Sequence, residues 1–322
     1  MKPVVANLRA TAMTTQFVKR SCPSCFASQP RPLFQLSPSQ FIQPNYEPEL
    51  QRRFGIEPGR KFGVVRCGRC SFVYAEHAPG PAFTALLYDS PDDEDSAAPE
   101  QHESLRPGFV GHQLKLASTL LEVIASEFGD IRPTILDFGC GFGALVRALN
   151  GPTANCVGYE TSGFMVRYMR TQGLPVVSTL SETPRNLHGI ILSDVLEHLP
   201  EPRSVLRDLR KLLVPKGLVC VNVPDFSESR VRIIAKQLNH GQRPPQELNP
   251  WEHLNYFSAE SLRHMLCDEG FNAIERQIDV GLRPNLRGVL RIGNAIKSIG
   301  RLLAYTATAR SNAMLIVAQS RI

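Results

Sequence analysis

The sequence lacks any run of 18 or more apolar residues, so it predicts no helix that crosses a membrane. Its first twenty residues also lack the continuous apolar core of a secretory signal. Because they are rich in Arg and Thr and free of acidic residues, we interpret residues 1–20 as a disordered leader, although an organelle transit peptide shares this composition. We expect a reducing, cytoplasmic compartment, where paired cysteines serve as metal ligands or redox centres rather than as disulfides.

Acidic residues are absent from positions 1–46 and 280–322, which hold five and seven basic residues. Removing these twelve from the 36 basic residues leaves 24 against 30 acidic ones, so the middle of the chain is acidic although the net charge is +6. The overall sign therefore does not predict nucleic-acid binding, and we expect no specific nucleic-acid partner. With 43% hydrophobic and 20% charged residues, the composition excludes a disordered chain and fits one large domain with a small one.

Four of the eight cysteines form two Cys-x-x-Cys pairs, Cys22 with Cys25 and Cys67 with Cys70. Each pair can form a tight knuckle that directs two thiolates at one ion, and two knuckles complete a tetrahedral zinc site. A thioredoxin-like redox pair is the alternative, but neither pair opens a helix within a βαβ pattern. Four thiolates leave no position for water, so we predict structural Zn²⁺ in a small zinc-ribbon-like domain at residues 21–88.

Seven acidic residues and no basic one lie between positions 89 and 103. Such a run is typical of a solvated linker, which we place at residues 89–110. Beyond it, short apolar runs that end in Gly or an acidic residue alternate with stretches of helical periodicity. This alternation predicts an α/β domain at residues 111–322, with a doubly wound, mostly parallel sheet of seven strands.

A glycine-rich turn at residues 139–143 follows a buried strand and precedes a helix. Glycines let backbone amides approach a ligand closely, and open α/β sheets bind cofactors beyond the strand ends. The turn alone does not decide which kind of cofactor binds. Gly139-x-Gly141-x-x-Ala144 satisfies the dinucleotide fingerprint, and Glu160 at the end of the next strand can bind ribose hydroxyls in either case.

Three features separate these classes. Asp137 lies two residues before the first glycine, where a carboxylate suits a ligand with an ammonium group and opposes a pyrophosphate. The fourth strand runs into DVLEHL at residues 194–199, and PKG at residues 215–217 leads into the fifth. Together these motifs resemble the class I S-adenosylmethionine-dependent methyltransferases, and the resemblance spans about residues 111–320.

The resemblance implies a Rossmann-like methyltransferase fold that binds S-adenosylmethionine (SAM). It assigns the methionine part of the cofactor to the glycine turn, the ribose diol to the acid after the second strand, and the other side of the cofactor to the end of the fourth strand. The cofactor-binding residues implied are Asp137, Gly139, Gly141, Gly143, Glu160, Ser193 and Asp194.

A second motif, PWEHLNYFS, occupies residues 250–258. Joined to a four-cysteine module, it resembles the zinc-containing sugar methyltransferases of deoxysugar and polysaccharide pathways, although Pro250 stands where that family has Tyr. The resemblance implies His253 as general base and Glu252 as its orienting or substrate-binding partner. His198, after the fourth strand, is the second candidate base, because His is the natural base at neutral pH.

Basic residues recur at helical spacing along residues 286–304, with apolar residues mostly on the opposite face. This pattern predicts a basic amphipathic helix inserted before the last strand. Three roles fit it: peripheral contact with an anionic membrane, a cap that offers cations to a phosphate-bearing acceptor, and a surface helix packed on the domain.

The sequence therefore predicts a SAM-dependent methyltransferase that acts on a small-molecule or sugar-type acceptor with His-assisted deprotonation. A quinone, lipid or natural-product hydroxyl is the alternative acceptor. The alternative of another class is a zinc-ribbon binding protein with a vestigial methyltransferase fold, which the intact Asp137 and glycine turn disfavour.

Overall fold

The chain folds into two compact units, each made of several segments, in the computed structural model. Helices among the described residues are all too short or too polar to cross a membrane. The expected helix at residues 286–304 lies outside the described part of the chain, as do most of the leader and most of the acidic linker. The structure describes residues 17–41, 56, 59–80, 84, 107–274 and 313–321.

A seven-stranded sheet forms the centre of the α/β unit, which comprises Pro91–Leu196, Arg203–Pro224 and Ala259–Ile322. Its strands are β6 (Thr134–Phe138), β7 (Asn155–Tyr159), β8 (Val176–Val177), β9 (Leu187–Ser193), β10 (Leu213–Pro224), β12 (Phe271–Ala273) and β13 (Ala313–Ser320). They follow the order β12-β13-β10-β9-β6-β7-β8. The strands from β10 to β8 pair in parallel, and β13 is antiparallel to both of its neighbours. The predicted mostly parallel, seven-stranded sheet is confirmed.

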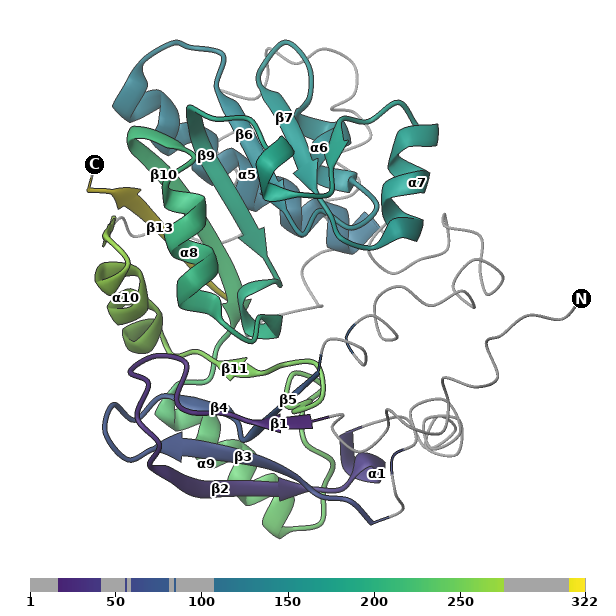
Figure 1. Ribbon diagram of the computed structural model, residues 1–322, viewed down its shortest axis with the longest axis vertical. Coiled ribbons are helices and arrows are strands. Elements are labelled where there is room, and N and C mark those ends of the chain that lie inside the picture. The colour runs from purple at the N-terminus through teal and green to yellow at the C-terminus, as the bar shows by residue number, and fades with distance from the viewer. Residues whose placement is uncertain are drawn as a thin grey trace, which may run out of the picture. The chain divides into compact units, whose positions relative to one another are not determined.

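Helices cover both faces of this sheet, and Figure 1 shows α5 behind the strands and α8 in front of them. The helices are α5 (Pro107–Phe128), α6 (Ala144–Leu149), α7 (Gly163–Thr171), α8 (Pro202–Arg210) and α10 (Ala259–Asp268). Gly189 of β9 lets α5 approach closely, because a Cβ there would lie 2.9 Å from Leu120 and 3.1 Å from Ile124. These two side chains belong to the buried apolar core on that face.

The order of the strands reverses at β6, which has β7 on one side and β9 on the other. In open parallel sheets, ligands bind beyond the carboxyl ends of the strands at such a point. The chain leaves β6 at Phe138 into the glycine turn, and it leaves β9 at Ser193 into Asp194. The strands that flank the reversal therefore carry the predicted cofactor-binding residues at their carboxyl ends.

The four-cysteine unit comprises Met1–Ser90, Glu197–Pro202 and Asp225–Ser258, so the α/β unit interrupts its sequence twice. Its elements are β1 (Phe17–Lys19), β2 (Pro30–Leu36), α1 (Pro38–Phe41), β3 (Phe62–Cys67), β4 (Val73–Ala75), β5 (His77–Pro79), α9 (Glu228–Asn239) and β11 (Asn255–Tyr256). The order β11-β4-β3-β2 gives an antiparallel sheet, and β1 pairs with β5.

Two elements of this unit, α9 and β11, come from the part of the sequence that was expected to belong to the second domain, at residues 111–322. Val231 and Ile234 of α9 share one buried cluster with Phe34 and Val64 of the sheet. The physical reason is core size: small domains bury a small fraction of their surface, and the later helix adds apolar side chains to the core of this unit.

Candidate functional site

The turn after β6 holds three glycines in the left-handed region, Gly139 (φ 75°), Gly141 (φ 55°) and Gly143 (φ 73°). A Cβ at Gly139 would lie 2.6 Å from Val195, and one at Gly143 would lie 2.6 Å from the end of the Met169 side chain, so a side chain at either would displace a neighbour in addition to the strain of a positive φ. A Cβ at Gly141 would meet no described atom within 4 Å. The backbone at this middle glycine therefore borders open space, which a ligand can approach closely.

Asp137 has a buried side chain at the carboxyl end of β6. Its Oδ2 has no hydrogen-bond partner among the described residues. Burial raises the pKa of Asp137 to about 7, and the carboxylate of Glu160 adds to the shift. A buried carboxylate without a partner is unfavourable, and a bound cation removes that cost. The site therefore fits a ligand with an ammonium group.

Glu160 connects the glycine turn to the start of α7. Its Oε2 accepts a hydrogen bond from Gly141 N at 2.9 Å, and its Oε1 accepts from Thr161 N at 2.7 Å and from Ser162 N at 2.9 Å. Each carboxylate oxygen has two lone pairs, so Glu160 keeps acceptor capacity for the hydroxyls of a ribose. Its position at the end of the strand beside β6 is the one predicted from the sequence.

Ser193 and Asp194 stand at the end of β9, and Asn222 of β10 holds them there. Asn222 Nδ2 donates to Ser193 Oγ at 3.4 Å, and Asp194 N donates to Asn222 O at 2.9 Å. Asp194 has φ 55°, a conformation that Asp adopts more readily than most side chains. The sequence did not single out Asn222, because one Asn within an apolar strand forms no motif.

The two cysteine knuckles bring their sulfur atoms together in the four-cysteine unit. Cys22 Sγ lies 3.5 Å from Cys70 Sγ, Cys25 Sγ lies 3.6 Å from Cys67 Sγ, and all four lie within 4.8 Å of one another. Zinc with Zn–S bonds of about 2.3 Å needs tetrahedral sulfur atoms about 3.8 Å apart. The observed separations fit this tetrahedron, whereas the sulfur atoms of a disulfide are about 2.05 Å apart.

The surroundings of Cys67 favour a metal-binding thiolate. Burial acts to raise the pKa of Cys67, but hydrogen bonds from the backbone amides of Cys70 and Arg69, together with those from neighbouring thiols, lower it to about 7. Burial raises the pKa of the Cys22 and Cys70 thiols, so Cys67 is the thiol of the cluster that ionises first among these three. Arg69 N donates to Cys67 Sγ at 3.4 Å. Because the thiolate is the form that ligates a metal, these amides favour metal binding at Cys67.

His198, Glu252 and His253 all belong to the four-cysteine unit. The two imidazole rings meet edge to face, with centroids 4.6 Å apart. His198 Nδ1 lies 3.0 Å from the main-chain oxygen of Glu252. A carbonyl oxygen only accepts, so Nδ1 carries the proton, and Nε2 is the nitrogen that can take up another. The main chain thereby leaves Nε2 as the basic nitrogen of a neutral His198.

The side chains around this pair also allow metal binding. Ligand atoms of Glu197, His198 and His253 lie within 4.8 Å of one another. A carboxylate with two imidazoles is a donor set that transition metals use, and it equally suits proton transfer. Burial raises the pKa of the Glu252 carboxyl, whose expected role as the partner of His253 stays a prediction.

Arg20 joins the two segments that carry these histidines. Its Nη1 donates to Leu254 O at 2.7 Å, and its Nη2 donates to Pro200 O and Asn255 Oδ1, both at 2.9 Å. Asn255 Nδ2 donates in turn to Leu199 O at 2.7 Å. Sequence reasoning missed both side chains, because these partners of Arg20 lie 180 to 235 positions away in the chain.

A family model described as a methyltransferase domain matches residues 106–276. The chain belongs to this family. The matched range holds every residue predicted to bind the cofactor or to act as base. It also runs through residues 197–202 and 225–258, so the segments that fold with the four-cysteine unit belong to the methyltransferase domain in sequence.

Curated relatives match part of this methyltransferase domain. An uncharacterized 37.1 kDa protein in transposon TN4556 of Streptomyces fradiae is 29% identical over 146 residues, which are 38% of this chain and 41% of that protein. A ubiquinone biosynthesis O-methyltransferase of Colwellia psychrerythraea is 27% identical over 133 residues, 37% of this chain and 52% of that protein. The chain thus spans about half the length of these relatives or less.

A solved structure shows the same fold. The plantazolicin methyltransferase BamL, in complex with a triazolic desmethylPZN analog and S-adenosylhomocysteine (SAH), has a TM-score of 0.51 and 14% identity; the match covers 74% of this chain and 94% of that one. The predicted Rossmann-like methyltransferase fold is confirmed. The predicted resemblance to sugar methyltransferases is not confirmed by these relatives, and the methyl acceptor is left to the chemistry of the site.

Proposed function

We propose that this methyltransferase domain binds SAM at the glycine turn and transfers its methyl group to a hydroxyl of a small-molecule acceptor. The observation that carries the proposal is the buried Asp137 carboxyl, whose Oδ2 lacks a hydrogen-bond partner among the described residues. The ammonium group in the methionine part of SAM supplies such a partner. Gly141 offers backbone that borders open space, and Glu160 offers acceptors for the ribose hydroxyls.

Bound SAM supplies a methyl group that its sulfonium already activates, so the protein has to align the acceptor and take up its proton. His198 fits the second task, because the carbonyl of Glu252 holds Nδ1 as the donor and makes Nε2 the basic nitrogen. His198 follows Asp194 by four residues, a span of at most about 14 Å even in an extended chain.

The resemblance found in the sequence implies His253 as the general base, whereas this proposal gives that role to His198. The contact of His198 Nδ1 with the main-chain oxygen of Glu252 leaves Nε2 of this imidazole as the basic nitrogen. We therefore give His198 the proton, and we give His253 the role of packing against the ring of His198. A hydroxyl acceptor is supported by the Colwellia relative, which is by name an O-methyltransferase.

In this proposal zinc stabilises the fold and takes no part in catalysis. Cys22, Cys25, Cys67 and Cys70 would hold the ion, and four thiolates leave it no position for substrate or water. The ion would stabilise a unit whose strands are short and whose core depends on a distant helix.

Calorimetry with SAH tests the cofactor site. We expect the wild-type protein to bind SAH and Gly141→Arg to abolish binding, because the new side chain fills the open space. Gly129→Arg is the matched control, since Gly129 also has a positive φ (77°) and open surroundings, but lies before the amino end of β6. Failure of the wild type to bind SAH would contradict the proposal and favour a binding protein with a vestigial methyltransferase fold.

Methyl transfer from labelled SAM to phenols, quinols and nucleotide-sugars then tests the acceptor. We expect transfer to phenolic or quinol hydroxyls. Transfer confined to nucleotide-sugars would restore the sugar acceptor that the sequence predicted and would contradict the present one.

A further inference from the structure

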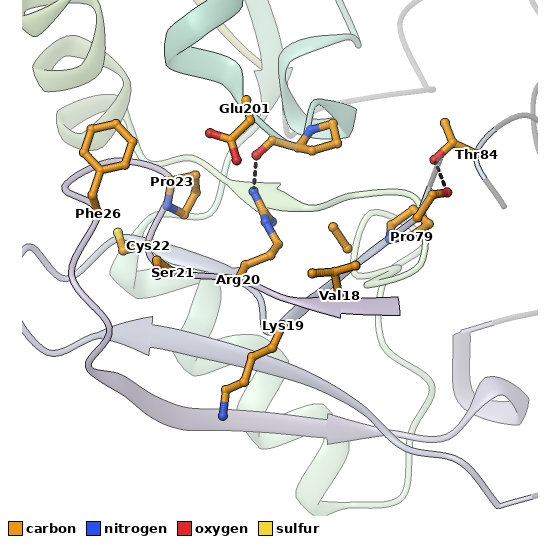
Figure 2. A pocket seen from close by; sticks show the side chains of 13 residues that line it. Val18, Lys19, Arg20, Ser21, Cys22, Pro23, Phe26, Pro79, Thr84 and Glu201 are labelled. Carbon is orange, nitrogen blue, oxygen red and sulfur yellow. Dashed lines mark hydrogen bonds between the residues drawn. The ribbon is translucent and has the colours of Figure 1, made fainter. Parts of the chain in front are cut away.

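A pocket of about 650 Å³ lies within the four-cysteine unit, beside the first cysteine knuckle. Its walls come from β1, the knuckle, the end of β5 and the two residues Pro200 and Glu201. Figure 2 shows Val18 and Pro79 on one side of the pocket and Phe26 on the other. The volume is within the range of sites that bind small organic molecules.

Two large apolar side chains of this pocket are open to solvent, Val18 at 56% and Phe26 at 57% exposure. Among the described residues, the other large hydrophobic side chains that are exposed are Ile131 and Ile233, and neither lines the pocket. Apolar surface gains about 25 cal/mol for each Å² that a ligand removes from water. A concentration of such surface in one cavity marks a binding site for an apolar group.

Part of the pocket wall comes from the chain segment that carries His198. Pro200 and Glu201, which line it, follow His198 by two and three residues. Arg20 also lines the pocket, and Figure 2 draws the hydrogen bond from its Nη2 to Pro200 O, 2.9 Å long. The same guanidinium also donates a hydrogen bond to the main-chain oxygen of Leu254, the residue directly after His253. A ligand in the pocket is therefore held by the framework that positions both imidazoles.

The charges of the pocket disfavour a phosphate group. The guanidinium of Arg20 is engaged by three oxygen acceptors of the fold. Lys19 pairs with Glu76 at 3.3 Å, and Figure 2 shows its ammonium directed away from the Arg20 guanidinium. Glu201 contributes a carboxylate to the wall, and that charge repels an anion. The pocket therefore suits an uncharged apolar group.

We propose that this pocket binds the apolar part of the methyl acceptor, and that the acceptor is an uncharged phenol-like compound with an alkyl or aryl substituent. The inference rests on the proposed function and narrows its substrate class. The hydroxyl to be methylated would project from the pocket toward the segment of His198.

Binding of 4-alkylphenols, from 4-ethylphenol to 4-hexylphenol, tests the pocket directly by calorimetry. In the wild-type protein, affinity should rise about three- to fourfold for each methylene that becomes buried. The double variant Val18→Ser/Phe26→Ser should bind 4-hexylphenol about tenfold more weakly and lose the dependence on chain length. Both side chains are exposed, so the polar replacements leave the apolar core intact.

Ile233→Ser is the matched control, because Ile233 is a comparably exposed (50%) apolar residue of the same unit outside the pocket. It should bind every member of the series as the wild type does. Absence of 4-hexylphenol binding to the wild type, unchanged binding by the double variant, or an equal loss in the control would each overturn the proposal.

SAH titration of the same variants separates this inference from the proposed function. Normal SAH binding with no effect of chain length means that the pocket assignment is wrong while the methyltransferase proposal stands. If the wild-type protein does not bind SAH, the proposed function itself is wrong.

Discussion

Arg20 donates from Nη2 to Asn255 Oδ1 across 2.9 Å, and together these two side chains bind three main-chain carbonyls. The carbonyls are those of Leu199, Pro200 and Leu254. All three lie within two residues of one of the paired histidines in the chain. Arg20 and Asn255 therefore hold together the two segments that carry the imidazoles.

Replacing Arg20 by Met should lower the free energy of unfolding of the four-cysteine unit by about 2–4 kcal/mol, because two partly buried acceptors and an exposed one lose their charged donor. Burial lowers the pKa of Arg20 to about 10, so the group keeps its charge at neutral pH. Urea denaturation measures the loss. Lys19→Met is the control, since the exposed pair of Lys19 with Glu76 contributes less than about 1 kcal/mol. Equal losses in the two variants would show that Arg20 does not hold the segments together.

His198→Ala should lower kcat by about 10²- to 10⁴-fold while SAH still binds, because the variant loses only the base. His253→Ala, which removes the ring that packs on His198, should reduce kcat much less. Turnover of an alkylphenol with labelled SAM measures both. If His253→Ala is the more damaging change, the base is the residue that sequence resemblance indicated.

SAH affinity should fall as the pH is lowered through about 7, the pKa to which burial raises Asp137. Protonation removes the negative charge that attracts the ammonium group of the ligand. Asp137→Asn should bind weakly and show little change between pH 6 and pH 8, which calorimetry can measure. Asp208→Asn, at an exposed acid of α8, should keep the wild-type profile.

The same carboxyl should make the cofactor-free protein less stable as the pH rises. In the fold, the pKa of Asp137 lies above its ordinary value of 3.8, so between pH 4 and pH 7 the folded state holds a proton that the unfolded state has lost. This contribution to stability is complete below about pH 3.8 and is lost as the pH rises through about 7. At pH 8, Asp137→Asn should therefore melt at a higher temperature than the wild type. A lower melting temperature would show that Asp137 is not destabilising when ionised.

Elemental analysis of protein purified in reducing, chelator-free buffer should find one zinc ion per chain. Cys67→Ser should remove it and lower the melting temperature, because the ion contributes folding free energy. Cys220→Ser, at a buried strand position outside the knuckles, should keep the zinc and serves as the control. Two ions, of which His253→Ala removes one, would place a metal at the imidazole pair and contradict the base role of His198.

The sheet and the glycine turn could be predicted because their signals are local. A run of apolar residues marks each buried strand, and the strand ends carry Asp137, Gly141 and Glu160. Parallel strands bring their carboxyl ends to one edge of the sheet. The four-cysteine cluster could be predicted for the same reason, because each Cys-x-x-Cys pair is a short local turn that brings two sulfur atoms together.

The composition of the four-cysteine unit could not be predicted in this way. The periodicity of α9 shows that Val231 and Ile234 share an apolar face, but it does not show which sheet that face covers. The bonds of Arg20 are likewise fixed by the folded chain, because a single Arg beside a cysteine knuckle has no pattern that names a carbonyl more than 200 positions away. The helix predicted at residues 286–304 stays a prediction.

The interrupted sequence of the four-cysteine unit sets an order for folding during synthesis. At about 5–20 residues per second, roughly 10–30 s pass between translation of residue 90 and of residue 258. For most of that interval the nascent chain has both cysteine knuckles but lacks α9, which is complete only at residue 239, and β11, which follows at residues 255–256. The thiolates can therefore capture their ion before the apolar core that supports them exists. Ribosomes stalled before and after residue 258 would yield nascent chains that differ in how firmly they hold the metal.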